Sequence, residues 1–530
     1  MTASISVVEA ARNNAAMGME IAAIAELDPQ RIAIISEHGN RTFKQLNDRA
    51  NQIAHMLRQQ GYRDGDGIAL LCSNRPEFIE VRFAAHRIGA RLTTVNWHLT
   101  SDEIAYIVDN CDAVALFADS RIADAAAMAA DKASRLNIKL AIGGAIDGFD
   151  DYDTALEAYP QHNIDNPGMG NVMQYTSGTT GRPKGVVRKN LDPSAAADMQ
   201  AIITAVFQFE PDSGTDKSLV AGPLYHAGPF NLSMTTPMTS GIGVVLMDKW
   251  EPETTLQLIE QYRITHSFFV PTMFMRLLQL PQSRRERYDL SSLRFILHGA
   301  APCAIDIKRQ MLDWLGPIIW EMFAGTEGMG TMVSPQEWLA KPGTVGKPGP
   351  GQVKVLDANG NTVPPGVEGQ IWVINPEDSK FEYYKAPEKT AESQRDGYFT
   401  AGDIGYLDDD GYMFLTGRSA ETIISGGVNI YPQEIDDVLL LHPKVADVAC
   451  VGVPHEDLGE QVKAVVQLVA GESPSQALEQ ELIDFCQPHL AKQKWPRSVD
   501  FVAQLARSEA GKVYRRQLRD SYWQGRDSKI

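Results

Sequence analysis

Cysteine is scarce in this chain of 530 residues, and its five cysteines are scattered. They include no Cys-x-x-Cys pair and no spacing typical of a zinc site, so a metal centre built on thiolates is not expected. Scattered thiols without partners are typical of a reducing compartment. We therefore expect a cytoplasmic protein without a disulfide framework.

Long apolar runs are absent as well. No stretch approaches the ~20 apolar residues that cross a membrane as a helix. The segment from Met1 to Leu27 contains acidic residues and has no continuous apolar centre like that of a secretory signal. The sequence therefore predicts neither a transmembrane segment nor an ordinary export signal.

Positive charge is in the minority, because 49 Lys and Arg residues stand against 67 Asp and Glu residues, a formal net charge of -18. Nonspecific binding to nucleic acid or to an anionic membrane needs a basic surface, so neither partner is expected. A phosphate-bearing ligand would have to be held by a local site. The composition leaves a homodimer open.

Helical and strand patterns alternate in the first third of the chain. Thr42 and Gln45 have the spacing of a capping box, and apolar residues follow at helical intervals. Gly67 to Cys72 and Ala113 to Ala118 are apolar runs of strand length, and Pro76 to Arg87 between them has a helical pattern. This alternation predicts an α/β fold with a largely parallel sheet covered by helices.

A β-rich part follows, because Gly343 to Gly351 is rich in glycine and proline and Val353 to Val373 reads as short strands around an Asn359-Gly360 turn. The segment Thr416 to Arg418 comes after a strand pattern and precedes a tail with its own helix and strand patterns. We predict a large N-terminal domain of α/β subdomains and a β-rich subdomain over residues 1–417, and a small α+β C-terminal domain over 418–530.

The segment from Tyr175 to Gly185 combines features that suit a polyphosphate. Its glycines let backbone amides turn toward a ligand, its hydroxyls donate hydrogen bonds, and its lysine adds a positive charge. The spacing is not that of a Walker A loop, and on these residues alone a flexible surface loop is an equal alternative. The candidate nucleotide-binding residues are Thr176, Ser177, Gly178, Thr179, Thr180, Gly181 and Lys184.

The whole of this segment resembles the signature loop of the adenylate-forming superfamily, which comprises acyl-CoA synthetases, luciferases and adenylation domains of peptide synthetases. Further segments resemble that family in its order over nearly the whole chain. The resemblance implies an enzyme that joins a carboxylic acid to AMP and then to coenzyme A. It implies ATP, Mg²⁺ and coenzyme A as cofactors, with Thr176 and Glu327 as magnesium ligands.

Phe323 to Gly328 resembles the family segment Tyr-Gly-x-Thr-Glu. In the family the aromatic residue stacks on adenine, the threonine contacts phosphate and the glutamate holds magnesium, which implies these roles for Phe323, Thr326 and Glu327. Phe323 and Ala324 replace the usual Tyr and Gly. A carboxylate suits Mg²⁺ because that ion prefers oxygen ligands. Taken alone, a Thr-Glu pair is more often a helix cap.

Two further segments resemble the walls of the family's substrate site. Gly299 to Pro302 resembles the strand end that lies along adenine and the acyl pocket, which makes Gly299, Ala300 and Ala301 candidates, although a buried turn is an equal alternative without the family. Pro223 to Gly228 resembles the segment whose histidine borders the acyl pocket. His226 is the candidate there, and a structural histidine is the alternative.

The ribose-binding aspartate of the family and the arginine that follows it correspond to Asp403 and Arg418. An acceptor carboxylate suits the diol of a sugar. Two residues later, at the family's hinge position, this chain has Ala420 where Asp or Lys is usual. A hinge need only absorb backbone rotation, so the resemblance still implies a mobile C-terminal domain.

The C-terminal domain contains two more matches. Ser425 to Glu434 resembles the loop that lines the pantetheine channel in the second half-reaction, which makes Gly426 and Gly427 candidates; a glycine turn before a helix beginning at Pro432 is also predicted. Arg507 to Lys512 resembles the segment whose lysine bridges the attacking carboxylate and the α-phosphate. Lys512 is therefore the main catalytic candidate, with Thr326, Glu327 and His226.

The sequence indicates the reaction more closely than it indicates which carboxylic acid is the substrate. Small residues around the candidate pocket suggest room for a bulky substrate, and Glu337 to Gly346 resembles a segment of synthetases for fatty, sterol-side-chain and bile acids. We expect a medium- or long-chain fatty acid or a bulky, sterol-side-chain-like acid. The alternatives are a ligase that passes the acyl group to an amine or carrier protein, a luciferase-like oxygenase, and a nucleotide-binding regulator without turnover.

Overall fold

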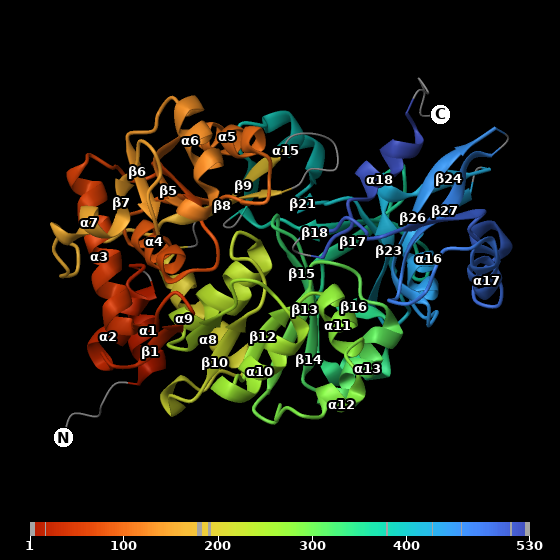
Figure 1. Cartoon of the computed structure of the whole chain (residues 1–530), viewed down its shortest axis with the longest axis horizontal. Helices are drawn as coiled ribbons and strands as arrows, with labels where there is room; N and C mark the ends of the chain where they lie inside the picture. The colour runs from red at the N-terminus through yellow and green to blue at the C-terminus, as the bar shows by residue number, and fades with distance from the viewer. Residues whose placement is uncertain are drawn as a thin grey trace.

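The structure is a computed structural model, and its elements form four sheets within the part of the chain that it describes. The two large sheets and their helices fill the left and lower centre of Figure 1, and the last sheet, in blue, lies with its helices at the right. The described residues are 6–15, 17–176, 183–188, 192–377, 380–426, 428–456, 458–508 and 511–524.

One large sheet has the strand order β19-β9-β8-β4-β3-β5-β6-β7 among the described residues. Its strands from β8 to β7 are parallel, and at one edge β9 pairs antiparallel with both β8 and β19. The strands are β3 (Gly67–Leu71), β4 (Arg91–Thr94), β5 (Ala113–Asp119), β6 (Ile138–Ile142), β7 (Asp150–Asp151), β8 (Asn171–Thr176), β9 (Lys184–Arg188) and β19 (Phe381–Tyr383).

The other large sheet has the order β15-β14-β13-β12-β10-β11-β1-β2 in the described chain. It is parallel except for β15 and β2 at its two edges. The strands are β1 (Ile32–Ile35), β2 (Arg41–Thr42), β10 (Lys217–Val220), β11 (Gly243–Leu246), β12 (His266–Phe269), β13 (Phe295–Gly299), β14 (Ile319–Ala324) and β15 (Met329–Val333).

Helices cover both large sheets, and one apolar core lies between the sheets because it takes buried residues such as Ile34 and Val244 from one sheet and Ile68 and Phe117 from the other. The outer faces have cores of their own. The main helices are α2 (Glu20–Leu27), α3 (Phe43–Gln59), α4 (Pro76–Arg87), α5 (Ser101–Asn110), α6 (Ala123–Lys132), α8 (Pro193–Val206), α10 (Pro252–Tyr262), α11 (Pro271–Leu278) and α13 (Ile305–Leu315).

The β-rich part is an antiparallel sheet in the order β16-β23-β22-β18-β21-β20, with β17 paired to β18. It contains the predicted turn, since the amide of Asn359 donates to Asp357 and Leu356 bridges Thr362. The strands are β16 (Thr344–Gly346), β17 (Val353–Leu356), β18 (Gly369–Ile374), β20 (Gln394–Arg395), β21 (Tyr398–Phe399), β22 (Asp403–Leu407) and β23 (Met413–Arg418).

The last sheet has the order β25-β24-β27-β26, with β28 parallel to β27. Helices pack on it around a separate apolar core. The strands are β24 (Ile423–Ser425), β25 (Val428–Ile430), β26 (Val445–His455), β27 (Gly459–Leu468) and β28 (Ser498–Val502), and the helices are α16 (Pro432–Leu439), α17 (Gln476–Cys486) and α18 (Arg515–Tyr522).

The predicted fold class, a mixed α/β chain with a large N-terminal part and a smaller C-terminal part, is confirmed. Helix α4 has the predicted bounds, and α3 begins with the predicted capping box, in which the Gln45 amide donates to Thr42 Oγ1 and the Thr42 amide donates to Gln45 Oε1. The segment Thr416 to Arg418 forms the end of β23. The domain boundary between residues 417 and 418 stays a prediction.

In the described part of the chain, we find no helix that combines the length and the apolar character needed to span a bilayer.

Candidate active site

The candidate nucleotide loop connects two antiparallel strands. Thr176 ends β8, Lys184 begins β9, and the two residues face each other as the last pair of that ladder. Tyr175, at the start of the signature, donates a hydrogen bond to Asn110 Oδ1 over 2.6 Å and so has a structural contact. The loop residues Ser177, Gly178, Thr179, Thr180 and Gly181 lie outside the described residues.

Thr326 and Glu327 lie in a tight turn between the antiparallel strands β14 and β15. The turn is closed by hydrogen bonds between the backbones of Gly325 and Gly328, over 2.8 and 3.3 Å. An Arg188 side chain donates to the backbone carbonyl of Glu327. The Thr-Glu pair therefore forms the tip of a hairpin and does not cap a helix, and the turn brings the Glu327 backbone to Arg188 of β9.

Tyr383 joins the two segments just described, and the sequence gives no signal for it because it lies far from both in the chain. Its hydroxyl donates to Glu327 Oε1 over 2.9 Å, and Lys184 Nζ stands 5.2 Å from the centre of its ring. Burial, together with the charge of Glu327, raises the pKa of Tyr383. The phenol therefore remains a hydrogen-bond donor at neutral pH.

Asp403 and Arg418 are direct partners in the ladder of β22 and β23. Arg418 Nε donates to Asp403 Oδ1 over 3.0 Å, and Asp403 is 9% exposed. The Asp403 carboxylate raises the pKa of Arg418. Ala420, at the predicted hinge position, lies in the short 3-10 turn Ser419–Glu421 that follows β23.

Lys512 lies in the segment between β28 and α18. It is exposed to water, yet the surrounding protein lowers its pKa by desolvation, and the nearby charge of Arg418 lowers it further. The carboxylates of Asp403 and Glu327 act in the opposite direction. The charges of the residues predicted to bind ribose and magnesium therefore act on the Lys512 ammonium.

The backbone around Lys512 is held by a charged clamp. Arg507 donates to both carboxylate oxygens of Asp447, each over 2.6 Å, and to the carbonyl of Gly511 over 2.7 Å. The Ser508 amide donates to the Lys512 carbonyl over 2.8 Å. Gly511 has a φ of 73° and packs against Thr272 at the start of α11. The lysine is therefore placed by its own loop and by the N-terminal part together.

His226 follows β10 and precedes a π-helical turn, Pro229–Thr235. Burial lowers its pKa to about 3, and the positive charges of Lys512 and His98 act in the same direction. Its buried Nε2 has no hydrogen-bond partner among the residues described here. The imidazole is therefore uncharged at neutral pH, and an uncharged ring is suited to line an acyl pocket.

The candidate adenine wall is the end of β13. Gly299 ends the strand, where a Cβ atom would lie 2.5 Å from the Met322 carbonyl oxygen, so only glycine fits without a shift. Ala300 next to it has a φ of 68°, a left-handed conformation that is unfavourable for alanine. Phe323 packs across its hairpin on Gly330 and stays half-buried, and Ala324 ends β14.

Gly426 lies apart from this group. It has a φ of 57° in the turn between β24 and β25, and its amide donates to the Leu458 carbonyl over 2.8 Å. Figure 1 shows β24 near the upper right edge of the molecule, well separated from β13 and β14. The predicted helix at Pro432 is present as α16. Gly427 lies outside the described residues.

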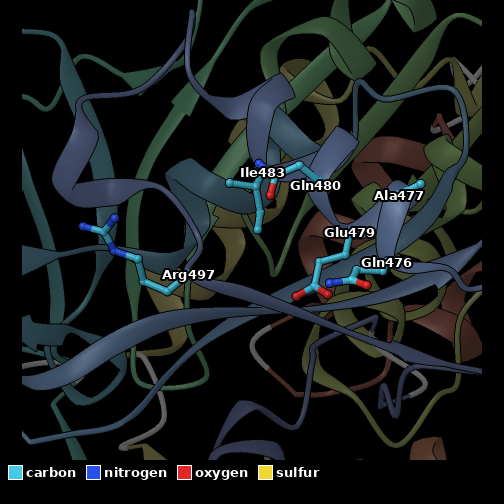
Figure 2. A pocket seen from close by; sticks show the side chains of 6 residues that line it. All are labelled: Gln476, Ala477, Glu479, Gln480, Ile483 and Arg497. Atoms are coloured by element: carbon cyan, nitrogen blue, oxygen red, sulfur yellow. The ribbon is translucent and has the colours of Figure 1, made fainter.

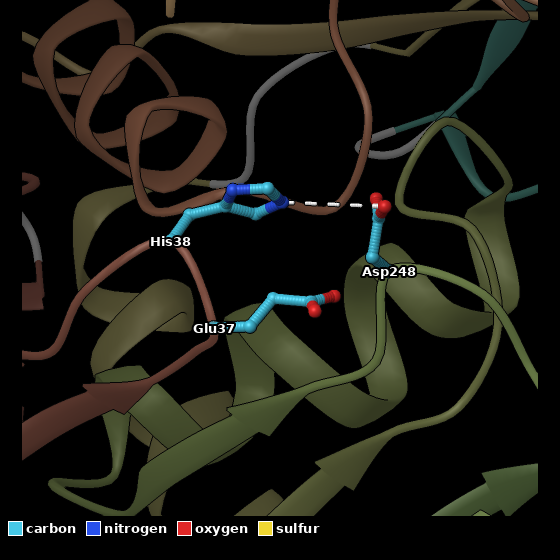
Figure 3. Close-up of side chains that lie close together, drawn as sticks. All are labelled: Glu37, His38 and Asp248. Atoms are coloured by element: carbon cyan, nitrogen blue, oxygen red, sulfur yellow. Dashed lines mark ion pairs between the residues drawn. The ribbon is translucent and has the colours of Figure 1, made fainter.

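Two other features lie outside this group of residues. Figure 2 shows a surface hollow along α17, lined by Gln476, Ala477, Glu479, Gln480, Ile483 and Arg497. Figure 3 shows Glu37, His38 and Asp248 close together, with His38 Nε2 4.0 Å from Asp248 Oδ2. Arg121 donates to both oxygens of Asp248, over 2.6 and 3.0 Å, so the carboxylate is already paired with a guanidinium.

Comparison with protein families gives two matches that together span most of the chain. Residues 21–381 match the model of the AMP-binding enzymes, and residues 434–512 match the model of the C-terminal domain of AMP-binding enzymes. The first match includes Thr176, Lys184, His226 and Glu327, and the second ends at Lys512.

Individual relatives cover nearly the full length. The fatty acid–acyl-carrier-protein ligase ScoC of Streptomyces coeruleorubidus is 31% identical over 94% of this chain and 95% of its own. The feruloyl-CoA synthase of an Amycolatopsis species is 33% identical over 93% and 96%. The structure of the amide bond synthetase McbA of Marinactinospora thermotolerans is similar with a TM-score of 0.79 and 26% identity, covering 97% of this chain and all of that one.

Proposed function

This chain belongs to the family of AMP-binding enzymes, and we propose that it is an acid–thiol ligase that uses ATP to join a carboxylic acid to coenzyme A. In the first half-reaction a carboxylate oxygen attacks the α-phosphorus of ATP, and the bond to pyrophosphate breaks. In the second half-reaction the coenzyme A thiol loses its proton, its sulfur attacks the acyl carbon of the adenylate, and AMP leaves.

The observation that carries this proposal is that the loop of Lys512 packs on Thr272 of the N-terminal part, where the charges of Arg418, Asp403 and Glu327 act on the lysine. Both reactants of the first half-reaction are anions, so the site must neutralise charge and align the groups. Lys512 would neutralise the carboxylate and the α-phosphate, and Lys184 the outer phosphates. Asp403 would accept hydrogen bonds from the ribose while Arg418 fixes its carboxylate.

The residues present also suit a magnesium ion. Tyr383 donates to Oε1 of Glu327, and Oε2 takes part in no hydrogen bond within the described chain. Thr176 would add a hydroxyl oxygen as a second ligand. Carboxylate and hydroxyl oxygens are the ligands that Mg²⁺ prefers. When bound, magnesium would withdraw negative charge from the phosphates of ATP.

The proposed acid is a medium- or long-chain fatty acid or a bulky, sterol-side-chain-like acid. The fatty acid ligase among the relatives supports the first of these. An aryl acid is a second candidate, because a feruloyl-CoA synthase is similarly close in sequence. The acceptor is proposed on the same basis: the relatives are named for coenzyme A, carrier-protein and amide products, so a carrier protein or an amine is the alternative to coenzyme A.

The proposal is tested by incubating the enzyme with ATP, Mg²⁺ and acids of four classes, namely short-chain, long-chain, aryl and steroidal, and by measuring AMP release with and without coenzyme A. We expect AMP release that requires both the acid and coenzyme A. Release that instead requires a carrier protein or an amine would favour the alternative acceptor. A preference for acetate would refute the bulky acid.

The role of Lys512 is tested separately with Lys512→Ala. We expect pyrophosphate release to be lost while thioester formation from a supplied acyl adenylate is kept, because the lysine is proposed to act only in the first half-reaction. Equal loss of both half-reactions would refute that role.

A further inference from the structure

We propose that Tyr383 is a positioning residue of the adenylating site, which holds the Glu327 carboxylate through its hydroxyl and flanks the Lys184 ammonium with its ring. This inference rests on the proposed function, because it assigns Tyr383 through two residues that are proposed to bind magnesium and phosphate.

The position of Tyr383 is fixed by its backbone. Strand β19 pairs antiparallel with β9, with Tyr383 opposite Val186. The Tyr383 amide donates to Thr390 Oγ1 over 3.0 Å, and the amide of the next residue, Tyr384, donates to the Gly185 carbonyl over 2.7 Å. The first bond ties Tyr383 to the helix that follows its strand, α15 (Pro387–Ser393), and the second ties this strand to the one that begins with Lys184.

The ring is also packed. The centre of the Tyr383 ring lies 5.4 Å from that of Phe381, at an interplanar angle of 74°, and Phe381 is fully buried. An edge-to-face pair of this kind adds to the stabilisation from burial. Backbone pairing and ring packing together restrict the orientation of the Tyr383 side chain, so the contact of its hydroxyl with Glu327 is preorganised.

The two contacts of Tyr383 serve groups of opposite charge. The hydroxyl donates to Glu327 Oε1 over 2.9 Å, and Lys184 Nζ lies 5.2 Å from the ring centre, within the ~6 Å range of cation–π attraction. No ion pair joins Glu327 to Lys184 in the described part of the chain. Tyr383 thus contacts both the Glu327 carboxylate and the Lys184 ammonium.

This arrangement has a consequence for substrate binding. A direct ion pair between Lys184 and Glu327 would cancel both charges and compete with phosphate and magnesium for them. The phenol is uncharged, so it orients one carboxylate oxygen without neutralising it and leaves the other free. Groups that orient metal ligands in this way typically change metal affinity when they are removed.

The neighbouring Tyr384 offers a matched control. Its hydroxyl donates to Asp112 Oδ2 over 2.6 Å, and the Arg91 guanidinium lies 4.5 Å from its ring centre. Like Tyr383, it therefore donates one hydrogen bond to a carboxylate and has cationic neighbours at its ring, with Lys385 Nζ 5.3 Å from the ring centre in addition to Arg91, which also donates to its hydroxyl over 3.2 Å. None of these partners belongs to the candidate site. Tyr384→Phe and Tyr383→Phe remove the same atom from adjacent residues.

The test measures ATP affinity by calorimetry at a series of magnesium chloride concentrations, with no acid present, so that no turnover is needed. We expect Tyr383→Phe to raise the magnesium concentration required for half-maximal tightening of ATP binding roughly 10-fold. We expect Tyr384→Phe to match the wild type. In a Glu327→Gln background, Tyr383→Phe should add nothing, because the group it orients has changed.

The outcomes separate the inference from the proposed function. If the wild type binds ATP with magnesium and Tyr383→Phe shows the same magnesium dependence, the inference is overturned and the proposed function stands. An equal effect of Tyr383→Phe with and without Glu327→Gln would show that it does not act through Glu327, and would also overturn it. A wild type that binds no ATP at any magnesium concentration would refute the proposed function itself.

Discussion

Gly511 packs so closely on Thr272 that a Cβ atom added to the glycine would lie well under 3.0 Å from Thr272 Oγ1. Thr272 belongs to α11 of the N-terminal part, and Gly511 precedes Lys512. This contact sets how deeply the lysine loop enters the site. A side chain at position 511 would push the loop away from α11 and take Lys512 with it.

We therefore predict that Gly511→Ala slows pyrophosphate release by about 10- to 100-fold, because small misplacements of a catalytic group have effects of this size. Thioester formation from a supplied acyl adenylate should change far less. Both half-reactions are measured with purified enzyme by rapid quench.

The control for this prediction is Gly471→Ala. Gly471 also has a positive φ, 96°, but a Cβ atom there would meet nothing within 4 Å. It therefore reports the backbone strain of an alanine in this conformation without the contact. Equal slowing by both variants would mean that strain, and not the contact with Thr272, causes the loss.

A pH prediction follows from Lys512. Its pKa is lowered by desolvation and by the charge of Arg418, so the ammonium loses its proton at a lower pH than a free lysine. If the charged form is required, kcat/KM for ATP should be constant near neutral pH and fall as the pH rises through this lowered pKa, because kcat/KM reports the free enzyme. Lys512→Arg keeps its charge at high pH, and its profile should lack this fall even if its rate is lower. A fall at the same pH in both proteins would assign it to another group.

The sequence predicted features that depend on near neighbours and missed those that depend on distant ones. The capping box at Thr42 and the bounds of α4 follow from residues a few positions apart, and both are present. The pairing of β19 with β9, which brings Tyr383 to Lys184, joins segments that lie far apart in the chain, since β9 ends at Arg188 and β19 begins at Phe381. No periodicity in the sequence predicts this strand pair, because the pairing depends on which strand edges are still unpaired after the rest of the sheet has formed.

The candidate site shows the same division. The residues of its loop predict Lys184, and the resemblance predicts Glu327, Asp403, Arg418 and Lys512. The structure pairs Arg418 with Asp403, places Lys184 at the ring of the tyrosine that binds Glu327, and exposes Lys512 to the charges of Arg418, Asp403 and Glu327. Their roles stay predictions. The contacts that hold them in place, from Tyr383, Thr272 and Arg507, come from residues whose types are common on any surface. Only the geometry distinguishes them.

Ala300 gives a prediction about stability. Its φ of 68° costs an L-residue roughly 1–2 kcal/mol, whereas a glycine there would lose about 0.4–1 kcal/mol through the greater freedom of the unfolded chain. We expect Ala300→Gly to raise the free energy of unfolding by roughly 0.5–1 kcal/mol, measured by urea denaturation. Ala301→Gly is the control: Ala301 does not have a positive φ, so this change should destabilise. A loss of stability in both would show that the conformation at Ala300 carries no strain.

The last prediction concerns Asn74, which follows β3 and ties the two large sheets together next to His226. Its Nδ2 donates to the carbonyls of Gly222 and Met247 over 3.0 and 2.9 Å, and its Oδ1 accepts from the Leu224 amide over 2.9 Å. The side chain is 6% exposed, so all three backbone groups depend on it and not on water.

Asn74→Ala should lower the free energy of unfolding by roughly 2–3 kcal/mol, because it leaves buried backbone groups without partners. It should also raise KM for the acid more than KM for ATP, since the segment it holds leads to His226 and not to the loop at Lys184. Thr94→Val is the matched control, because Thr94 Oγ1 makes a single hydrogen bond to the Tyr225 carbonyl, over 3.2 Å, in the same region. We expect a smaller loss of stability from it. Equal increases of both KM values in Asn74→Ala would mean that the side chain supports the fold in general and does not position the acyl side of the site.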